Sequence, residues 1–224
     1  MSAQPNAGMQ PKQFENPMGV DGFEFVEFAA PDPKLLHALF PRLGFTAVAR
    51  HKRRKITLYR QGECNFLVNE EPNSFAAAFA KQHGPSACGF AIRFSKPAAE
   101  VREQALKKGG EAVDQLESTK AVEVPVIKGI GGSMLYLVDH YGPMGEVYAG
   151  EFEYLAGVDK HPKGFGLTFV DHLTHNLYFG NMEKFAKFYE QLFNFREIRY
   201  FDIKGVKTGL ISKAMTAPDG MVRI

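Results

Sequence analysis

The fold is decided by the stretch Gly22-Phe23-Glu24-Phe25-Val26-Glu27-Phe28, which runs into Ala30-Pro31-Asp32-Pro33. Its first seven residues are rich in aromatic and β-branched side chains and predict a strand. Asp32 is expected to cap a following helix, and Pro33 suits the first helical position, where proline is tolerated. The apolar stripe of this helix is expected to consist of Leu35, Leu39 and Leu43, with Leu36 and Phe40 beside them.

Short strand-like runs follow the helix after Gly44. They cover residues 45–49, 56–59 and 64–68, and turn-forming residues such as Gly62 separate them. Together with the first strand and helix they make a β-α-β-β-β unit of about 50 residues. This mixture of elements predicts the α+β class.

The unit recurs along the chain. A second strand at 87–94 leads into a helix that ends at Gly109-Gly110, followed by strand candidates near 121–127, 133–138 and 146–154. A shift of 150 positions then places Asp21–Phe25 on Asp171–His175, and Leu43-Gly44-Phe45 on Phe193-Asn194-Phe195. A third helical stripe is expected from Phe185, Phe188, Tyr189 and Leu192. A repeat of this kind predicts duplicated modules in one architecture.

The third copy is expected to be incomplete. Strands are predicted at 195–203 and 207–213 with a turn at Gly205, and residues 221–224 look like the opening of one more strand. A glycine-rich linker at 157–164 separates this copy from the first two. The sequence therefore predicts two whole units and most of a third.

Composition excludes several classes of protein. The chain has 224 residues, 45% of them hydrophobic, and a formal net charge of +2 from 27 Lys+Arg and 25 Asp+Glu. It contains no apolar run long enough for a membrane helix and no basic excess typical of nucleic-acid binding. The basic cluster at 51–55 is interpreted as a solvated hairpin turn, with a binding patch as the less favoured alternative.

The two cysteines and the first residues favour a reducing cytoplasm. Cys64 and Cys88 each lie in an apolar run, where a free thiol behaves as a small buried hydrophobe. The beginning of the chain lacks the basic and apolar regions of a signal peptide. A disulfide framework is therefore not expected.

Chemistry is expected at His172, which the repeat aligns with Gly22. His172 and His175 both lie on the predicted first strand of the third unit, and their odd spacing places them on opposite faces, so they cannot chelate one metal together. A site built on one copy of the scaffold and a hydrogen-bonded structural histidine both remain open. An Fe(II) site that binds substrate and O2 typically needs two histidines and a carboxylate, whereas Glu183 and Glu190 are interpreted as a solvated helix face. This chain is expected to supply at most one ligand from the strand.

Several blocks resemble the bacterial 4-hydroxyphenylpyruvate dioxygenase family. They include Glu15-Asn16-Pro17-Met18-Gly19, Asp171-His172-Leu173-Thr174-His175-Asn176, Tyr200-Phe201-Asp202-Ile203-Lys204-Gly205 and Ser212-Lys213-Ala214-Met215-Thr216-Ala217-Pro218-Asp219-Gly220. The resemblance implies the vicinal oxygen chelate fold, in which four β-α-β-β-β modules pair into two open barrels. It divides the chain into a disordered lead (1–17), an N-terminal structural barrel of two modules (18–156), a linker (157–167) and an incomplete catalytic barrel (168–224). It also implies that His172 is the first of three iron ligands and that Ser212 lies near the substrate pocket.

The activity implied by the resemblance is the Fe(II)-dependent oxidation of 4-hydroxyphenylpyruvate by O2 to homogentisate in tyrosine breakdown. The second histidine and the glutamate of the family are expected beyond Ile224, so the chain itself is expected to be an inactive fragment. A homo-oligomer, dimeric or tetrameric, is also implied, with neither nucleic acid nor membrane as partner. The alternatives are a 4-hydroxymandelate synthase and a short paralogue that binds aromatic ligands or a partner without catalysis.

Overall fold

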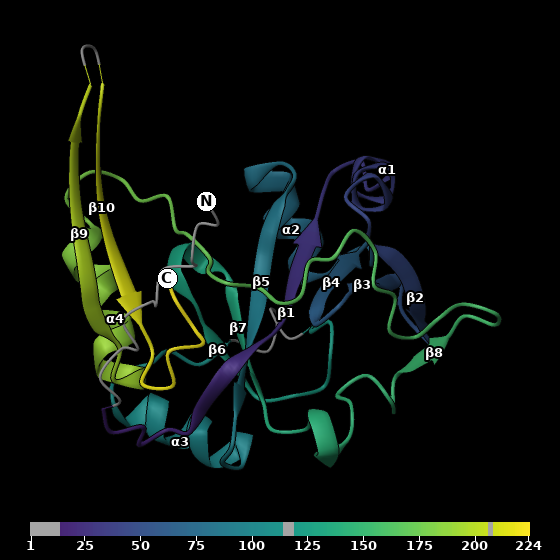
Figure 1. The fold of residues 1–224 in the computed structure, drawn as a ribbon, viewed down its shortest axis with the longest axis horizontal. Coiled ribbons are helices and arrows are strands. Elements are labelled where there is room, and N and C mark those ends of the chain that lie inside the picture. The colour runs from purple at the N-terminus through teal and green to yellow at the C-terminus, as the bar shows by residue number, and fades with distance from the viewer. Residues whose placement is uncertain (1–13, 114–118, 206–207) are drawn as a thin grey trace, which may run out of the picture.

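The computed structural model describes residues 14–113, 119–205 and 208–224. Figure 1 shows a large curved sheet with a separate two-stranded hairpin standing at one side. The strand order of the large sheet is β6-β7-β5-β1-β4-β3-β2-β8, and the hairpin consists of β9 and β10. The architecture is α+β, as predicted from the sequence.

The first unit forms half of the large sheet. It comprises β1 (Val20–Ala29), α1 (Lys34–Arg42), β2 (Thr46–His51), β3 (Ile56–Gln61) and β4 (Cys64–Asn69). β1 pairs with β4 in parallel, and β4, β3 and β2 continue as antiparallel neighbours. The predicted β-α-β-β-β unit is therefore present.

The second unit repeats the arrangement of the first with one difference. It comprises β5 (Ser86–Phe94), α3 (Ala98–Lys107), β6 (Val126–Lys128), the 3-10 turn η2 (Ile130–Gly132) and β7 (Met134–Val138). β5 pairs with β7 in parallel, as β1 pairs with β4, and β1 and β5 lie antiparallel at the centre with Val26 opposite Phe90. After the 3-10 turn η3 (Gly142–Met144), the last strand β8 (Phe152–Tyr154) pairs with β2 of the first unit. The sequence did not indicate this exchange between units.

Helix ends confirm the 150-residue repeat. α1 is followed by Gly44 with a φ of 89°, and α4 (Met182–Phe193) is followed by Asn194 with a φ of 58°. Both residues take the left-handed conformation that commonly ends a helix, where glycine and then asparagine are the residues of lowest cost. Gly44 and Asn194, which the repeat aligns, therefore both end a helix in the left-handed conformation.

Two helices differ from the sequence-based expectation. In α1 the buried side chains are Leu36 and Phe40, whereas Leu35, Leu39 and Leu43 are exposed. The expected stripe was wrong because the ring of Phe40, packed against Phe28 and Phe45, determines which helix face meets the sheet. α2 (Phe75–His83), between β4 and β5, was not predicted, and the Ser74 hydroxyl caps it by accepting from the Ala77 N–H.

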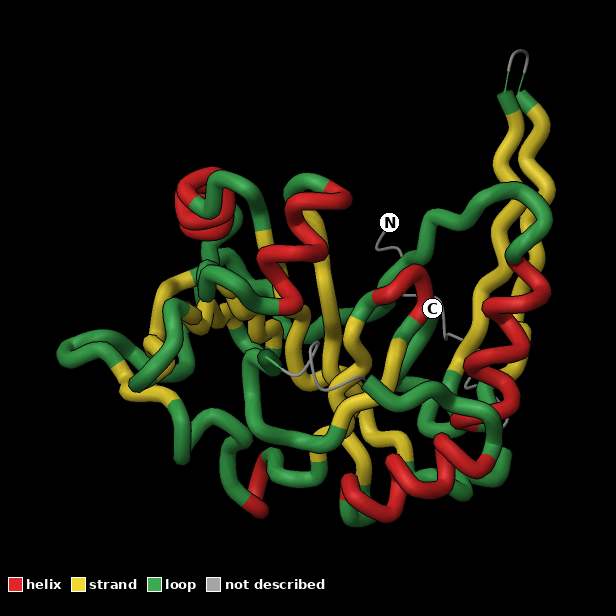
Figure 2. Tube along the Cα trace, turned by 180° about the vertical axis from the view of Figure 1, so that it is seen from behind, coloured by secondary structure: helices red, strands yellow, loops and turns green. Residues whose placement is uncertain are grey.

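The third unit consists of α4, β9 (Arg196–Lys204) and β10 (Gly209–Thr216), with an extended segment before α4. The predicted hairpin is confirmed by its register, in which Ile203 lies opposite Leu210. The predicted further strand is begun by residues 222–224, since Met215 and Ile224 exchange two backbone hydrogen bonds of 2.8 and 3.0 Å. Figure 2 shows α4 lying along the lower part of this hairpin.

No strand forms at residues 171–176, where the repeat predicted one. In the first unit the corresponding strand β1 lies between β4 and β5 and pairs with both. Within the described residues, the segment has one ladder-like backbone bond, from the Leu173 N–H to the Arg223 carbonyl at 3.1 Å. The segment is extended but lacks neighbours on both sides, and the expectation of a strand was wrong for this reason.

Apolar packing joins the third unit to the second. One core cluster contains residues from α3 and from α4, and the rings of Phe94 and Phe193 lie 5.8 Å apart between their centroids. A second cluster fills the concave side of the large sheet and includes Phe25, Leu58, Tyr136 and Tyr148. The extended segment before α4 therefore leads into a helix that is packed on the second unit.

The lead and the linker touch the rest of the chain where they are described. Residues 1–13 of the expected lead lie outside the described residues, while the Arg196 guanidinium lies 4.1 Å from the ring centroid of Phe14. The linker runs across the end of β3, where the Gly62 N–H donates to the Pro162 carbonyl at 3.0 Å. Among the described residues, no helix is both long and apolar enough to cross a membrane.

Candidate functional site

His172 lies in the extended segment and is held by its neighbour. Its Nδ1 donates to Asp171 Oδ2 at 2.8 Å, and the Arg223 guanidinium binds the other carboxylate oxygen at 2.6 Å. The His172 side chain is 58% exposed. Within the described part of the chain only Nδ1 of this ring has a hydrogen-bond partner, so Nε2 is available to a ligand from outside.

His175 points the opposite way. Leu173, His175 and Leu177 are partly buried, whereas His172, Thr174 and Asn176 are exposed. His175 Nε2 lies 2.7 Å from the Tyr189 hydroxyl on α4, and burial lowers the pKa of His175 to about 4. The alternation predicted for a strand thus holds in this segment without a full ladder, because Leu173 and Leu177 pack on the core.

Gly22, the position in the first unit that aligns with His172, has a backbone conformation that disfavours a side chain. Gly22 has a φ of 94°, in the left-handed region, and its N–H donates to Asp219 Oδ2 at 2.9 Å. A side chain at that position would be strained. The first unit therefore cannot carry an imidazole there at low cost, whereas the third unit carries one in an extended segment.

Ser212 lies on β10, opposite Phe201, and is half-buried. The structure places it on the hairpin, on a different element from His172. The described residues contain no group of three or more His, Cys, Asp and Glu side chains that could hold a metal ion. His172 and Ser212 are thus two separate candidates.

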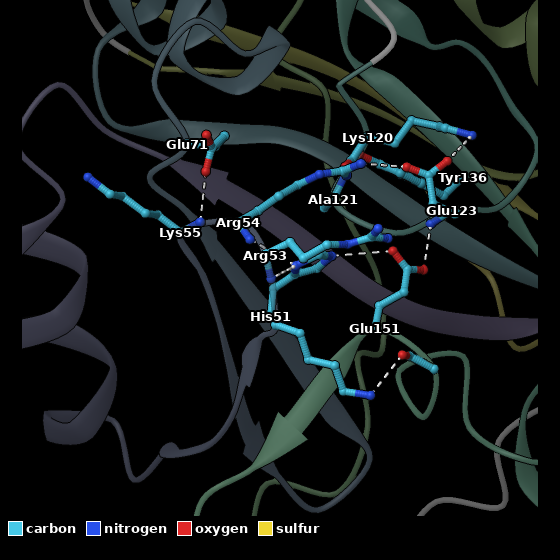
Figure 3. A network of polar contacts seen from close by, with 12 residues as sticks. His51, Arg53, Arg54, Lys55, Glu71, Lys120, Ala121, Glu123, Tyr136 and Glu151 are labelled. Carbon is cyan, nitrogen blue, oxygen red and sulfur yellow. Dashed lines mark hydrogen bonds and ion pairs between the residues drawn. The ribbon is translucent and has the colours of Figure 1, made fainter.

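The basic cluster forms a turn that is tied to the second unit (Figure 3). His51 is buried, its Nδ1 accepts from the Arg53 and Arg54 N–H groups, and its Nε2 lies 3.3 Å from Glu151. Arg54 binds Glu123 at 2.6 Å and the Lys120 carbonyl. The predicted hairpin turn is confirmed, and its His51 and Arg54 are engaged within the chain rather than presented as a basic patch.

Sequence reasoning missed a polar cavity of about 470 Å³ at the concave side of the large sheet. Glu24, Arg60, Asn65 and Arg93 line it from four different strands. The signal was available, because each is a charged or amide residue within an apolar strand. Only the strand order brings them together.

These features define a protein class. Repeated β-α-β-β-β units, with parallel pairs at β1/β4 and β5/β7, form the vicinal oxygen chelate fold. The solved structure of a 4-hydroxymandelate synthase mutant from Streptomyces coelicolor shares this fold, with a TM-score of 0.72 at 19% identity over 92% of this chain and 62% of that one.

The family follows from the sequence. Residues 14–153 match the family model described as "Hydroxyphenylpyruvate dioxygenase, HPPD, N-terminal", and the chain belongs to this family. It is 53% identical over 211 residues to the 4-hydroxyphenylpyruvate dioxygenase of Pseudomonas sp. (strain P.J. 874), covering 94% of this chain and 59% of that protein. It also resembles a solved "xylose isomerase-like TIM barrel/4-hydroxyphenylpyruvate dioxygenase fusion protein", with a TM-score of 0.77 and 29% identity over 94% of this chain and 33% of that one. The chain thus spans somewhat under two thirds of the length of its curated relative.

Proposed function

We propose that the whole protein oxidises 4-hydroxyphenylpyruvate to homogentisate with Fe(II) and O2. The observation that carries this proposal is the exposed His172 imidazole, held through Nδ1 by Asp171 in a chain that belongs to the 4-hydroxyphenylpyruvate dioxygenase family. Histidines that bind metals almost always donate their other ring N–H to a carboxylate or carbonyl, which fixes the ring and raises its basicity. His172 has this arrangement.

The described residues fit one position of an iron site. His172 offers Nε2, and the 2-His-1-carboxylate set of non-haem Fe(II) oxygenases requires two further ligands. His172 would hold one position of an Fe(II) ion, which would supply the Lewis-acid and redox chemistry for oxidative decarboxylation and ring hydroxylation. We therefore propose His172 as one ligand of a site that other residues complete.

The chain's own side chains would orient the ligand and keep water out. Asp171 holds the His172 ring, and Arg223 in turn fixes the Asp171 carboxylate. The hairpin offers exposed apolar side chains, among them Ile198, Ile203 and Leu210, as a wall for an aromatic substrate. We keep Ser212, half-buried on β10, as a proposed substrate contact.

We also propose the division of the chain and its setting in the cell. The proposed parts are a lead (1–17), a structural barrel (18–156), a linker (157–167) and part of a catalytic barrel (168–224). A cytoplasmic location is supported by two buried free cysteines. A homo-oligomer is proposed from the family, and sedimentation of the purified chain would test it.

The activity is testable with a chimera. Residues 1–224 would be fused to the remaining C-terminal part of the Pseudomonas sp. relative, and homogentisate formation would be measured with Fe(II). His172→Ala should abolish turnover. His140→Ala is the matched control, because His140 is also exposed and bonded through Nδ1 to the preceding aspartate. Full turnover by the His172→Ala chimera would refute the assignment.

Two alternatives give different products or none. A 4-hydroxymandelate synthase would convert the same substrate to 4-hydroxymandelate, and mass spectrometry of the chimera's product separates the two. A short binding paralogue would leave the chimera inactive at any iron concentration. The first alternative rests on the shared fold alone.

A further inference from the structure

Four polar side chains form a hydrogen-bonded row across the concave side of the large sheet. Arg60 Nε donates to Asn65 Oδ1 at 2.7 Å, and Asn65 Nδ2 lies 3.4 Å from Glu24 Oε1. Glu24 Oε2 accepts from Arg93 Nε at 2.5 Å. Glu24, Arg60 and Asn65 are each at most 5% exposed. Two guanidinium groups are thereby fixed in the wall of the 470 Å³ cavity.

These guanidinium groups have more donors than the row uses. Arg60 Nη1 reaches Glu146 at 3.1 Å and the Lys160 carbonyl at 3.0 Å. The Arg60 guanidinium also meets the Tyr154 hydroxyl. Within the described residues, both Nη atoms of Arg93 make no hydrogen bond, and Glu63 approaches Arg93 Nη2 only to 3.6 Å. A guanidinium has five N–H donors and no acceptor. The wall therefore has a surplus of charged donors.

Tyr148 lies behind the two arginines, outside the set of residues that line the cavity. In the described part of the chain its hydroxyl makes no hydrogen bond of ordinary geometry, and the Glu24 carboxylate is the acceptor beside it. The Arg60 guanidinium lies 5.6 Å from the centroid of its ring. Burial, followed by the charge of nearby Glu24, raises the pKa of Tyr148 well above its ordinary value, so the hydroxyl keeps its proton. Tyr148 therefore supports the wall from behind, with Glu24 as its acceptor.

We propose that this cavity binds a small monocarboxylate, whose oxygens accept hydrogen bonds from Arg60 and Arg93. A carboxylate is an acceptor-only group that matches a guanidinium fork in geometry and charge. Tyr141 and Tyr154 line the same cavity and offer ring surface to the rest of the molecule. A volume of this size falls within the usual range for small-molecule sites. This site lies in the first two units and is separate from the proposed oxidation.

Benzoate is the probe, and benzamide is its neutral control of similar shape. Titration of the full chain should give saturable shifts of the Gly62 and Gly142 amide resonances, since both residues line the cavity. Benzamide should give none. Arg60→Lys should weaken benzoate binding about tenfold, the effect of losing one hydrogen bond to a charged group. Tyr178→Phe, at a tyrosine that is 89% exposed, should leave it unchanged.

A second variant separates charge from geometry. Arg93→Lys keeps a cation beside Glu24 and should also weaken benzoate at least tenfold, because a lysine cannot bind a carboxylate with two parallel donors. Absence of saturable shifts up to the solubility of benzoate overturns the proposal. So does equal binding of benzamide, or unchanged binding by Arg60→Lys with its fold intact by circular dichroism.

Discussion

The His175 ring and the Tyr189 hydroxyl meet at 2.7 Å, at the junction between the extended segment and α4. The two rings stack at 5.8 Å between centroids, and Phe90 of β5 lies 6.2 Å from His175. The segment that carries His172 is therefore fixed by a partly buried imidazole three residues further along. His172 faces outward because His175 faces inward.

This contact predicts a loss of stability in acid. Burial lowers the pKa of His175 from 6.5 to about 4, so between these values the unfolded chain binds a proton that the folded chain does not. The free energy of unfolding should fall as the pH drops from 6.5 to 4, by up to about 1.4 kcal/mol per pH unit. His175→Gln does not titrate and should remove this part of the dependence in urea unfolding. His172→Gln, at an exposed ring, should retain it.

The buried carboxyl group of Glu27 should make stability depend on pH in the opposite direction. It is fully buried, with Asn69 and Tyr136 each 2.7 Å from its carboxyl oxygens, and burial raises its pKa despite these bonds. The stability contributed by its protonated form is present below its unfolded pKa and declines as the pH rises toward the folded pKa. Glu27→Gln should flatten this decline in denaturant titrations above pH 5. If Glu27→Gln and exposed Glu153→Gln have the same pH profile, the interpretation is wrong.

The junction between α3 and α4 should depend on Phe193. This ring is fully buried against Phe94, and its removal leaves a cavity in the cluster shared by the two helices. Phe193→Ala should cost about 3 to 5 kcal/mol of unfolding free energy. Phe179→Ala, at a ring that is 94% exposed, should cost less than about 0.5 kcal/mol. Equal midpoints in guanidinium chloride would contradict the shared core.

The basic turn should matter for folding more than for binding. His51→Ala removes the acceptor for two turn N–H groups and the partner of Glu151, so a loss of about 1 to 3 kcal/mol is expected. His140→Ala should be near neutral, because that side chain is 70% exposed. Binding of a DNA oligonucleotide at low salt would show that the turn has a second role.

The exposed hairpin should bind apolar dye. Ile203 and Leu210 lie opposite each other and are both more than half exposed. The paired change Ile203→Lys and Leu210→Glu should lower the fluorescence of bound anilinonaphthalene sulfonate and raise solubility. The control is the paired change Lys204→Glu and Asp202→Lys, which lies on the same strand and leaves the net charge unchanged. Undiminished fluorescence of the Ile203→Lys and Leu210→Glu protein would mean that the dye binds elsewhere.

Local pattern predicted much of this fold. The repeat, the β9–β10 hairpin and the free cysteines depend on residues close in sequence or at one fixed offset. The face of α1 was wrong because Phe40 is positioned by Phe28 and Phe45 from other elements. The strand expected at 171–176 failed for a related reason, since a strand needs neighbours that periodicity does not supply.

The candidate sites likewise combine features that the sequence predicts with features that it does not. His172 was singled out by its alignment with Gly22, and strand alternation placed it on the opposite face from His175 without saying which face is exposed. Its bond to Asp171 is local, yet the support of Asp171 by Arg223 spans 52 positions. The cavity row joins Arg60 to Arg93 through Glu24 and Asn65, and four separate strands contribute to it. No spacing in the sequence indicates such a row.

The packing of α4 on α3 also has a consequence for the order of assembly. The third unit takes its core from the second unit, which precedes it along the chain. Each new segment emerging from the ribosome therefore meets an apolar surface that has already been made, whereas the contacts that orient His172 involve Tyr189 and Arg223, which lie later in the chain. Synthesis from the N-terminus thus makes the supporting core first, and the direction of the imidazole is set only after α4 and Arg223 have been added.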